Sequence, residues 1–324
     1  MSSGEDDLIA RYFKPLACAP GALGLSDDAA ILQGRGDDLV VTVDAIVEGV
    51  HFLPDDPPDT VARKALRVNL SDLAAKGATP AGFVLTLALH AVSEAWLAPF
   101  ADALGEDARL FECPLLGGDT VSTPGPAMIS ITAFGRLPPG EMVRRAGARP
   151  GDVVVVSGTI GDATLGLSIL QGAPSPGLDA TARAALVARY RVPQPRVALA
   201  RAVRAHSSAA MDVSDGLMGD LAKLCRASGV SAAVAAGPIP LSAPARAWLS
   251  EDTAAIGRVV SGGDDYEILC AVPETRLAAF QGAARAAGAP VSVIGRITAG
   301  EGEAMLRDPS GRQIRLERHS YSHF

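Results

Sequence analysis

Four separate apolar runs of this chain end in aspartate. These aspartates lie in segments 24–28, 41–44, 117–119 and 211–216, and a fifth acidic segment, 69–72, lies within a helical pattern. Carboxylates that converge repel one another and raise one another's pKa, so a fold that gathers them needs a cation among them. The usual cation is Mg²⁺, which binds a few carboxylates together with water and substrate phosphates. The pattern therefore predicts a fold that brings these segments together, and it favours phosphoryl or nucleotide chemistry.

The length and composition of the chain favour two α/β domains. At 324 residues the chain is long for one core, and a Pro/Gly-rich connector at residues 137–140 predicts a boundary near residue 140. We expect an N-terminal domain over 1–140 that binds ATP and metal, and a C-terminal α/β domain over 141–324. The aromatic content of 4% and the Ala-rich composition favour parallel sheets covered by helices. The net charge of −7 argues against nucleic acid as a partner.

The cysteines and the termini indicate a reducing compartment. Cys18, Cys113, Cys225 and Cys270 are widely spaced and form no C-x-x-C pair, so reduced thiols are expected. Residues 1–7 are acidic and lack the apolar core of a signal peptide. The longest apolar stretch, 83–92, is too short to span a bilayer. We expect a soluble cytoplasmic protein with no membrane partner.

Periodicity predicts the elements that carry the acidic segments. Apolar residues recur at helical spacing over 59–76, and β-branched residues dominate 39–44. In the first half we also expect helices over 6–13 and 94–112, strands over 81–90 and 127–135, and a strand from 114 that stops at two glycines. In the second half we expect strands over 153–157, 209–211 and 268–272, and helices over about 162–171 and from about 217.

Two aspartates have surroundings that favour a ligand role. Asp44 follows a Val-rich strand, and ligands tend to bind beyond the carboxyl ends of strands. Asp72 lies among apolar residues of a predicted helix, where a charged side chain is rarely buried without a partner. A helix cap is the alternative for Asp72, and a solvated turn is the alternative for Asp28.

Two glycine- or serine-containing segments are typical of phosphate sites. Gly118 and Asp119 follow an apolar strand, and glycines let backbone amides approach phosphate closely. An ordinary turn is the alternative. Asp212, Ser214 and Asp215 precede a predicted helix whose N-terminus favours anions, so the aspartates could bind metal and Ser214 phosphate. A capping role for Ser214 or Asp215 is compatible with this.

Arginine and histidine candidates are ambiguous by themselves. Arg144 and Arg145 lie at the predicted domain junction, and an arginine there could bind phosphate or be a solvated surface residue. His51 could line a pocket or lie in a core. The chain contains no G-x-G-x-x-G, no P-loop and no protein-kinase signature, so a Rossmann cofactor site and those kinase classes are not indicated.

Taken together, ten segments of the sequence resemble the thiamine-monophosphate kinase family from end to end and in the family's order. These segments are residues 5–13, Ser26-Asp-Asp-Ala-Ala30, Thr42-Val-Asp44, His51-Phe52, residues 68–78, Leu116-Gly-Gly-Asp-Thr120, residues 145–152, Asp212-Val-Ser-Asp-Gly216, Ser261-Gly-Gly-Asp-Asp-Tyr-Glu267 and Tyr321-Ser-His-Phe324. The resemblance implies the two-domain α/β (α+β) fold shared with aminoimidazole-ribonucleotide synthetase. It also implies a homodimer whose N-terminal sheets pair.

The resemblance implies ligands for several Mg²⁺ ions and for two substrates, ATP and thiamine monophosphate. The implied metal ligands are Asp28, Asp44, Asp72, Asp119, Asp212 and Asp215, with the Thr42 hydroxyl and the Val43 carbonyl. The residues implied to position ATP phosphates are Gly118, Asp119, Arg145 and Ser214. Those implied for the thiamine-phosphate pocket are His51, Asp264 and Arg318, and Phe111 is implied to lie near adenine.

Three of these positions depart from the family pattern. Val43 replaces a common hydroxyl residue, so a metal contact there must use its carbonyl. Asp264 replaces a common Glu and is one methylene shorter. Arg318 falls where an aromatic residue often packs on the substrate; an arginine could stack on a ring or contact phosphate.

The implied reaction is the last step of thiamine diphosphate biosynthesis, transfer of phosphate from ATP to thiamine monophosphate. The acceptor is a phosphate monoester with a second pKa near 6, so its oxygen is already a nucleophile and no general base is required. Catalysis should consist of positioning and charge neutralisation, with Asp44, Asp212 and Arg145 carrying it.

Two other hypotheses remain at this point. One is a sister enzyme on the same fold, an ATP-dependent cyclase or a selenophosphate synthetase; the latter needs a reactive Cys near a Lys, and Cys18 lacks that context. The other is a dimeric module that binds nucleotide or metal and regulates a partner.

Overall fold

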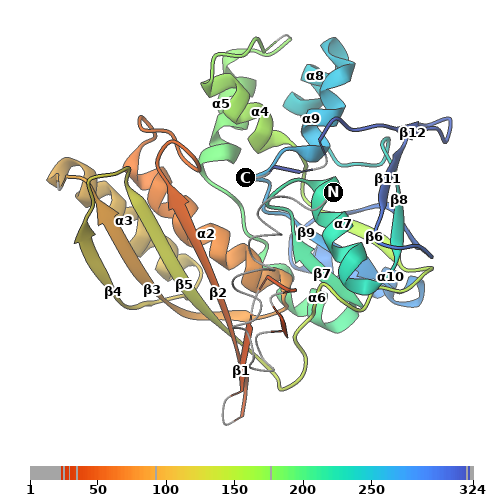
Figure 1. The fold of residues 1–324 in the computed structure, drawn as a ribbon, viewed down its shortest axis with the longest axis horizontal. Helices are drawn as coiled ribbons and strands as arrows, with labels where there is room; N and C mark the ends of the chain where they lie inside the picture. Colours follow the sequence, from red (N-terminus) through yellow and green to blue (C-terminus); the bar gives the residue numbers. More distant parts are fainter. Residues whose placement is uncertain are drawn as a thin grey trace.

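The computed structural model describes residues 23–24, 26–28, 30–33, 36–91, 93–175, 177–318 and 320–321. The helix expected over 6–13, the cysteine at position 18 and residues 322–324 of the tail lie outside these ranges. The described chain folds around two β-sheets, with helix α2 between them (Figure 1).

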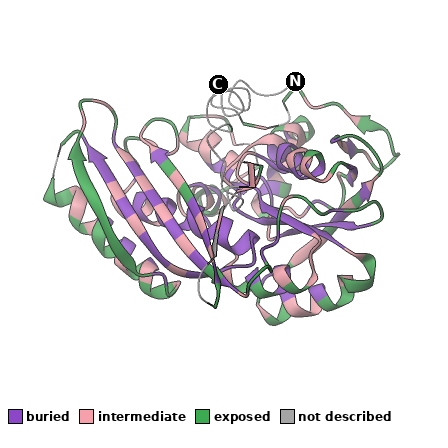
Figure 2. Cartoon of the chain, turned by 60° about the horizontal axis from the view of Figure 1, so that its bottom comes forward, coloured by how far each residue is buried: buried purple, intermediate pink, exposed green. Residues whose placement is uncertain are grey.

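The first sheet has the strand order β1-β2-β5-β3-β4, and only β3 and β4 pair in parallel. Helices α2 and α3 pack on one of its faces (Figures 1 and 2). The other face carries exposed apolar side chains, among them Val43 and Leu116 at 59% and 61% exposure. The elements of this half are β1 (Ala30–Gln33), β2 (Asp38–Val47), α2 (Pro58–Ala75), β3 (Thr79–Leu89), α3 (Glu94–Leu110), β4 (Leu115–Ser122) and β5 (Met128–Leu137).

Strand β2 turns alternate side chains toward α2. Val40, Thr42 and Ile46 are buried, whereas Val43 between them is exposed, as the two-residue period of a strand requires. The β-branched pattern predicts that this strand ends at Asp44, but the strand continues to Val47. Asp44 is therefore in mid-strand and on the side of the sheet that faces α2.

Helix α2 is buried almost all around. Fourteen of its 18 residues are buried, which is unusual for a helix with charged residues and follows from its place between the two sheets. Pro58 starts the helix at a position where its missing N–H is not needed. Since Lys64, Arg67 and Asp72 are among the buried residues, each needs a partner nearby.

The second sheet has the strand order β12-β11-β8-β10-β6-β9-β7, and only β8 and β11 pair in parallel. Its strands are β6 (Val153–Ser157), β7 (Ala209–Asp212), β8 (Ser231–Ala235), β9 (Ile268–Val272), β10 (Val291–Thr298), β11 (Ala304–Arg307) and β12 (Gln313–Ile314). Its α-helices are α4 (Asp162–Leu170), α5 (Ala180–Arg191), α6 (Ala200–His206), α7 (Leu217–Ser228), α8 (Ala243–Glu251), α9 (Ile256–Ser261) and α10 (Glu274–Ala286).

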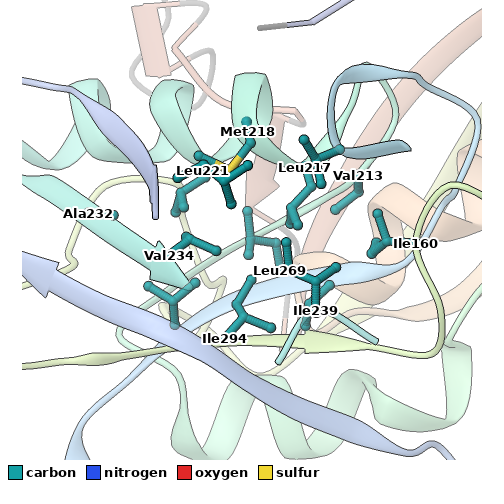
Figure 3. Close-up of a cluster of buried hydrophobic side chains, with 14 of the residues drawn as sticks. Ile160, Val213, Leu217, Met218, Leu221, Ala232, Val234, Ile239, Leu269 and Ile294 are labelled. Carbon is teal, nitrogen blue, oxygen red and sulfur yellow. The ribbon is translucent and has the colours of Figure 1, made fainter. Parts of the chain in front are cut away.

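Both faces of this sheet are covered by apolar cores. Leu217 and Leu221 of α7 pack with Val234 and Leu269 on one face (Figure 3). On the other face, Val155 and its neighbours pack with Ala74 and Ala75 of α2, so one core joins the two halves of the chain.

Two expectations about strands are wrong. Composition favoured parallel sheets, yet most described pairs are antiparallel, because an apolar composition reports burial on both faces and not strand direction. The strand expected to stop at the glycines runs through them as β4. Position 118 requires glycine, because the Cβ of any other residue would lie 2.0 Å from the carbonyl oxygen of Leu85 on β3.

Candidate active site

A cavity of about 410 Å³ lies where the two sheets meet around α2. Most residues proposed from the sequence line it, although they come from both halves of the chain. The proposed residues on its wall are Asp28, Val43, Asp44, His51, Asp72, Arg145, Asp212, Ser214, Asp215 and Asp264. Distant segments of the sequence therefore meet in one cavity.

Three carboxylates form the centre of this cavity. Asp28, Asp72 and Asp212 each offer an oxygen atom within 4.8 Å of the others, an arrangement that could hold a metal ion. Asp72 comes from the interior of α2, so it is not a helix cap, and Asp212 ends β7. The Thr42 hydroxyl donates a hydrogen bond of 2.5 Å to Asp72 Oδ2, which adds another oxygen to the group.

Asp44 lies beside this group and is held through its backbone. Its N–H donates to Asn69 Oδ1 on α2 at 3.1 Å. The contact fixes β2 against the helix that carries Asp72. The side chain of Asp44 remains on the cavity wall.

Burial and mutual repulsion raise the pKa values of these carboxyl groups. Burial raises the pKa of Asp212 to about 7, and the charges of Asp220 and Asp44 add to the rise. Burial raises the pKa of Asp44 to about 6, with Asp215 adding to it. Burial, followed by the charges of Asp212 and Asp44, holds the pKa of Asp72 well above its ordinary value. The cluster therefore binds protons or cations readily near neutral pH.

Two cations contact Asp28. The guanidinium of Arg145 forms an ion pair with Asp28, and its backbone N–H donates to Asp27 Oδ2 at 2.8 Å. Lys76 Nζ lies 2.7 Å from Asp27 Oδ1 and 3.0 Å from Asp28 Oδ2. Arg144 is exposed, so the alternative of a solvated surface residue holds for Arg144 and not for Arg145.

Ser214 and Asp215 lie in the turn before α7. The cap position of α7 is Gly216, which has no side-chain hydrogen bond, so neither residue caps the helix. Asp215 Oδ2 accepts a hydrogen bond of 2.5 Å from Lys223 Nζ. Its N–H donates to Asp220 Oδ2 at 3.0 Å. Lys223 and Asp220 were not among the site residues predicted from the sequence.

The other end of the cavity carries His51 and Asp264. His51 Nδ1 accepts the N–H of Val47 at 3.1 Å. Lys64 Nζ, from α2, lies 2.8 Å from Asp264 Oδ2 and 2.8 Å from the carbonyl oxygen of His51. Tyr266 donates to Asp264 Oδ1 at 3.2 Å. Lys64 thus connects His51 with Asp264. The sequence feature that could have identified Lys64 is a lysine on a buried helix face.

Four proposed residues lie elsewhere. Gly118 and Asp119 are on β4, which is exposed along its whole length and is separated from β2 by two strands (Figure 2). At about 4.8 Å per strand this is roughly 14 Å from Asp44. Arg318 is exposed and does not line the cavity, whereas Tyr321 does. Phe111 packs near Arg67, 5.3 Å from its guanidinium carbon to the ring centre.

Comparisons with known proteins agree with this architecture. Residues 26–137 match the AIR synthase related protein, N-terminal domain, and residues 149–307 match the corresponding C-terminal domain. The fold and cavity thus define an AIR synthase related protein with two α/β domains, which confirms the expected fold class.

Curated relatives and solved structures narrow this class. A thiamine-monophosphate kinase of Caulobacter vibrioides is 48% identical over 98% of this chain and 90% of that protein. AaThiL complexed with AMPPCP and TMP is 28% identical, with a TM-score of 0.84 over 99% of this chain and 96% of that one. The Stenotrophomonas maltophilia K279a thiamine-monophosphate kinase structure is 38% identical, with a TM-score of 0.77 over 97% and 99%. The chain belongs to the thiamine-monophosphate kinase family.

Membership of this family makes the chain a kinase enzyme and confirms the resemblance drawn from the sequence. The regulatory module and the sister enzymes are not supported by these relatives. None of the helices in the described ranges is long and apolar enough to cross a membrane.

Proposed function

We propose that the chain transfers the terminal phosphate of ATP to thiamine monophosphate in the cavity around α2, with Mg²⁺ bound by the acidic cluster. The convergence of Asp28, Asp72 and Asp212 within 4.8 Å carries this proposal. Their donors are hard carboxylate oxygens, joined by the Thr42 hydroxyl, and this set suits Mg²⁺. When bound, Mg²⁺ supplies charge neutralisation between the two anionic substrates.

The remaining aspartates of the cavity complete the metal ligands. Asp44 and Asp215 lie on its wall, from β2 and from the turn before α7. Val43 could contribute its carbonyl, since its side chain points to the exposed face. Ser214 also lies on the cavity wall, in the turn before α7, and we assign it to a phosphate oxygen of ATP.

Arg145 is the proposed contact to the transferring phosphate. Its guanidinium pairs with Asp28 and is 21% exposed, so it can leave that carboxylate for a phosphate oxygen without crossing the core. The acceptor phosphate is already ionised and needs no base. The chain therefore contributes position and charge, and it holds Asp44 and Asp212 ionised once cations are bound.

The end of the cavity that carries His51 and Asp264, here called the acceptor end, is proposed to hold the thiamine part of the substrate. His51 and Asp264 lie at this end, and Val50, Leu167 and Tyr321 also line the cavity. Tyr321 supplies an aromatic ring on the cavity wall, whereas Arg318 would have to act from outside the cavity.

We further propose that the enzyme works as a homodimer whose partner subunit supplies Gly118 and Asp119. Within one chain these residues are too far from Asp44 to share a ligand with it, and they lie on an exposed edge strand. The open face of the same sheet is apolar, with Val43, Leu116 and Val121 exposed, and a second sheet would cover it. Pairing of the two sheets would bring β4 of one subunit toward β2 of the other.

Mixing two inactive variants tests this sharing of residues. Asp44→Asn and Asp119→Asn are each expected to be inactive as homodimers. In a mixed dimer with shared sites, one site carries both changes and the other carries neither. Random mixing then restores about a quarter of wild-type activity, because about half of the dimers are mixed and half of their sites are intact. No recovery after unfolding and refolding the mixture would show that each site is built within one chain.

Product analysis tests the reaction itself. The chain is incubated with Mg·ATP and thiamine monophosphate, and thiamine diphosphate and ADP are expected in equal amounts. Formylglycinamidine ribonucleotide in place of thiamine monophosphate is the control for a cyclase. ADP release with that compound alone would contradict the proposal.

A further inference from the structure

Lys76 has an ammonium group without access to solvent at the end of α2. Its side chain is 0% exposed. Nζ donates a hydrogen bond to the carbonyl oxygen of Ala210 at 2.9 Å and forms ion pairs with Asp27 Oδ1 at 2.7 Å and Asp28 Oδ2 at 3.0 Å. A buried lysine is costly unless it is paired, and this one is paired with two carboxylates.

These partners connect the three segments that form the acidic cluster. Asp28 is itself a member of the cluster, and Ala210 lies on β7 two residues before Asp212. The backbone N–H of Lys76 also donates to the carbonyl oxygen of Asp72 at 2.9 Å. One residue therefore contacts every segment that supplies a carboxylate to the centre of the cavity.

We propose that Lys76 is a positioning residue that serves as a built-in cation of the acidic cluster. It holds the three ligand segments together before any metal binds, and its charge offsets repulsion that a metal ion would otherwise have to offset. This inference rests on the metal site proposed above.

Lys76 differs from Arg145, the other cation on Asp28. Arg145 lies on the cavity wall and is partly exposed, so a phosphate can take it from Asp28. Lys76 does not line the cavity, because its side chain is fully buried and its Nζ is hydrogen-bonded to Ala210 on β7. When Arg145 turns to a substrate, Lys76 remains as the fixed counter-charge of Asp27 and Asp28.

The experiment compares melting temperatures with and without Mg²⁺ for wild type and Lys76→Met. Removal of the ammonium leaves Asp27 and Asp28 close to two other buried carboxylates. We expect the metal-free variant to melt roughly 10 °C lower than wild type. We expect Mg²⁺ to recover about half of this loss or more, because a divalent cation can take over the missing charge. The upward shift caused by Mg²⁺ should be at least about twice that of wild type.

Lys64→Met is the matched control. Lys64 is a second buried lysine of α2, with 2% exposure, but its partner carboxylate is Asp264 at the acceptor end. We expect this variant to lose stability too, with a Mg²⁺ shift no larger than that of wild type. The comparison separates loss of any buried cation from loss of one at the cluster.

The outcomes distinguish this inference from the metal site. Calorimetry of wild type with Mg²⁺ and a non-hydrolysable ATP analogue tests the site alone, and absence of metal binding overturns both proposals. If wild type binds Mg²⁺ but the Mg²⁺ shift of Lys76→Met equals that of wild type, only the role of Lys76 is overturned. If Lys76→Met does not fold without metal, Lys76→Gln replaces it, and rescue of either variant by Mg²⁺ supports the inference. Failure of both in both buffers contradicts it.

Discussion

Raising the pH from 6 to 8 should strengthen Mg²⁺ binding strongly, because the carboxyl groups of the cluster must lose protons to bind metal. Burial raises the pKa of Asp212 to about 7 and that of Asp44 to about 6. An ordinary aspartate, with a pKa near 4, would be ionised throughout this range and would give no such dependence.

The size of the effect follows from the ionised fractions. At pH 6 about a tenth of Asp212 and half of Asp44 are ionised, and at pH 8 nearly all of both. If binding requires both carboxylates, the apparent affinity rises about 20-fold over these two pH units. Asp72, whose pKa is also raised, adds to the effect.

The assay is calorimetry of Mg²⁺ binding at pH 6, 7 and 8, in two buffers that differ in their ionisation enthalpy. The difference between the buffers counts the protons released, which should approach one or more per binding event at pH 6. Asp212→Asn is the control, and in this variant the rise in apparent affinity between pH 6 and pH 8 should be about tenfold smaller. A pH-independent affinity without proton release would refute the reasoning.

The same raised pKa values reverse the usual effect of pH on the metal-free protein. The folded state binds more protons than the unfolded state between the ordinary pKa and the raised one. The stability from Asp212 is therefore fully present below about pH 4 and is lost as the pH rises through about 7. Asp212→Asn should have a melting temperature that varies less with pH over this range.

Three further outcomes are expected. Asp44→Asn should lower turnover by roughly 100-fold or more while circular dichroism and the melting temperature show an intact fold, and wild-type turnover in this variant would contradict the assignment. Asp107→Asn should lower the free energy of unfolding by about 3 kcal/mol in urea titrations, because it removes the fully buried carboxylate that pairs with Arg67, and a change under about 1 kcal/mol would contradict this. Gly118→Ala should loosen β4 and weaken the dimer in sedimentation experiments, because the added Cβ would lie 2.0 Å from the Leu85 carbonyl oxygen; an unchanged dimer constant would count against it.

The sequence predicted the parts of the site that local patterns determine. Helical spacing of apolar residues placed Asp72 inside α2 and not at its start, and the structure has it there. The short strand before Asp212 and the helix from residue 217 are likewise β7 and α7. In each case a single run of residues contains both the element and the functional side chain.

Pairing between distant segments could not be predicted in this way. The two glycines of β4 have the signature of a turn, and the close approach of β3, which explains a glycine at position 118, cannot be read from that signature. The counter-charges Lys64 and Lys76 were missed for the same reason, because their carboxylate partners lie in distant segments. A lysine has no local pattern that tells which carboxylate, 200 residues away in the case of Lys64 and Asp264, it will meet.

The exposure of these cations suggests how a site crowded with carboxylates can both fold and react. Lys76 is 0% exposed, whereas Arg145 and Lys223 are 21% and 24% exposed. A cation that cannot leave stabilises the cluster at all times, so the cluster can form without metal. Arg145, on the cavity wall, can exchange its carboxylate partner for a phosphate oxygen as metal and substrates arrive. Because the exchange replaces one ion pair by another, the arginine keeps an anionic partner when the substrate phosphates arrive, while Lys76 remains with Asp27 and Asp28.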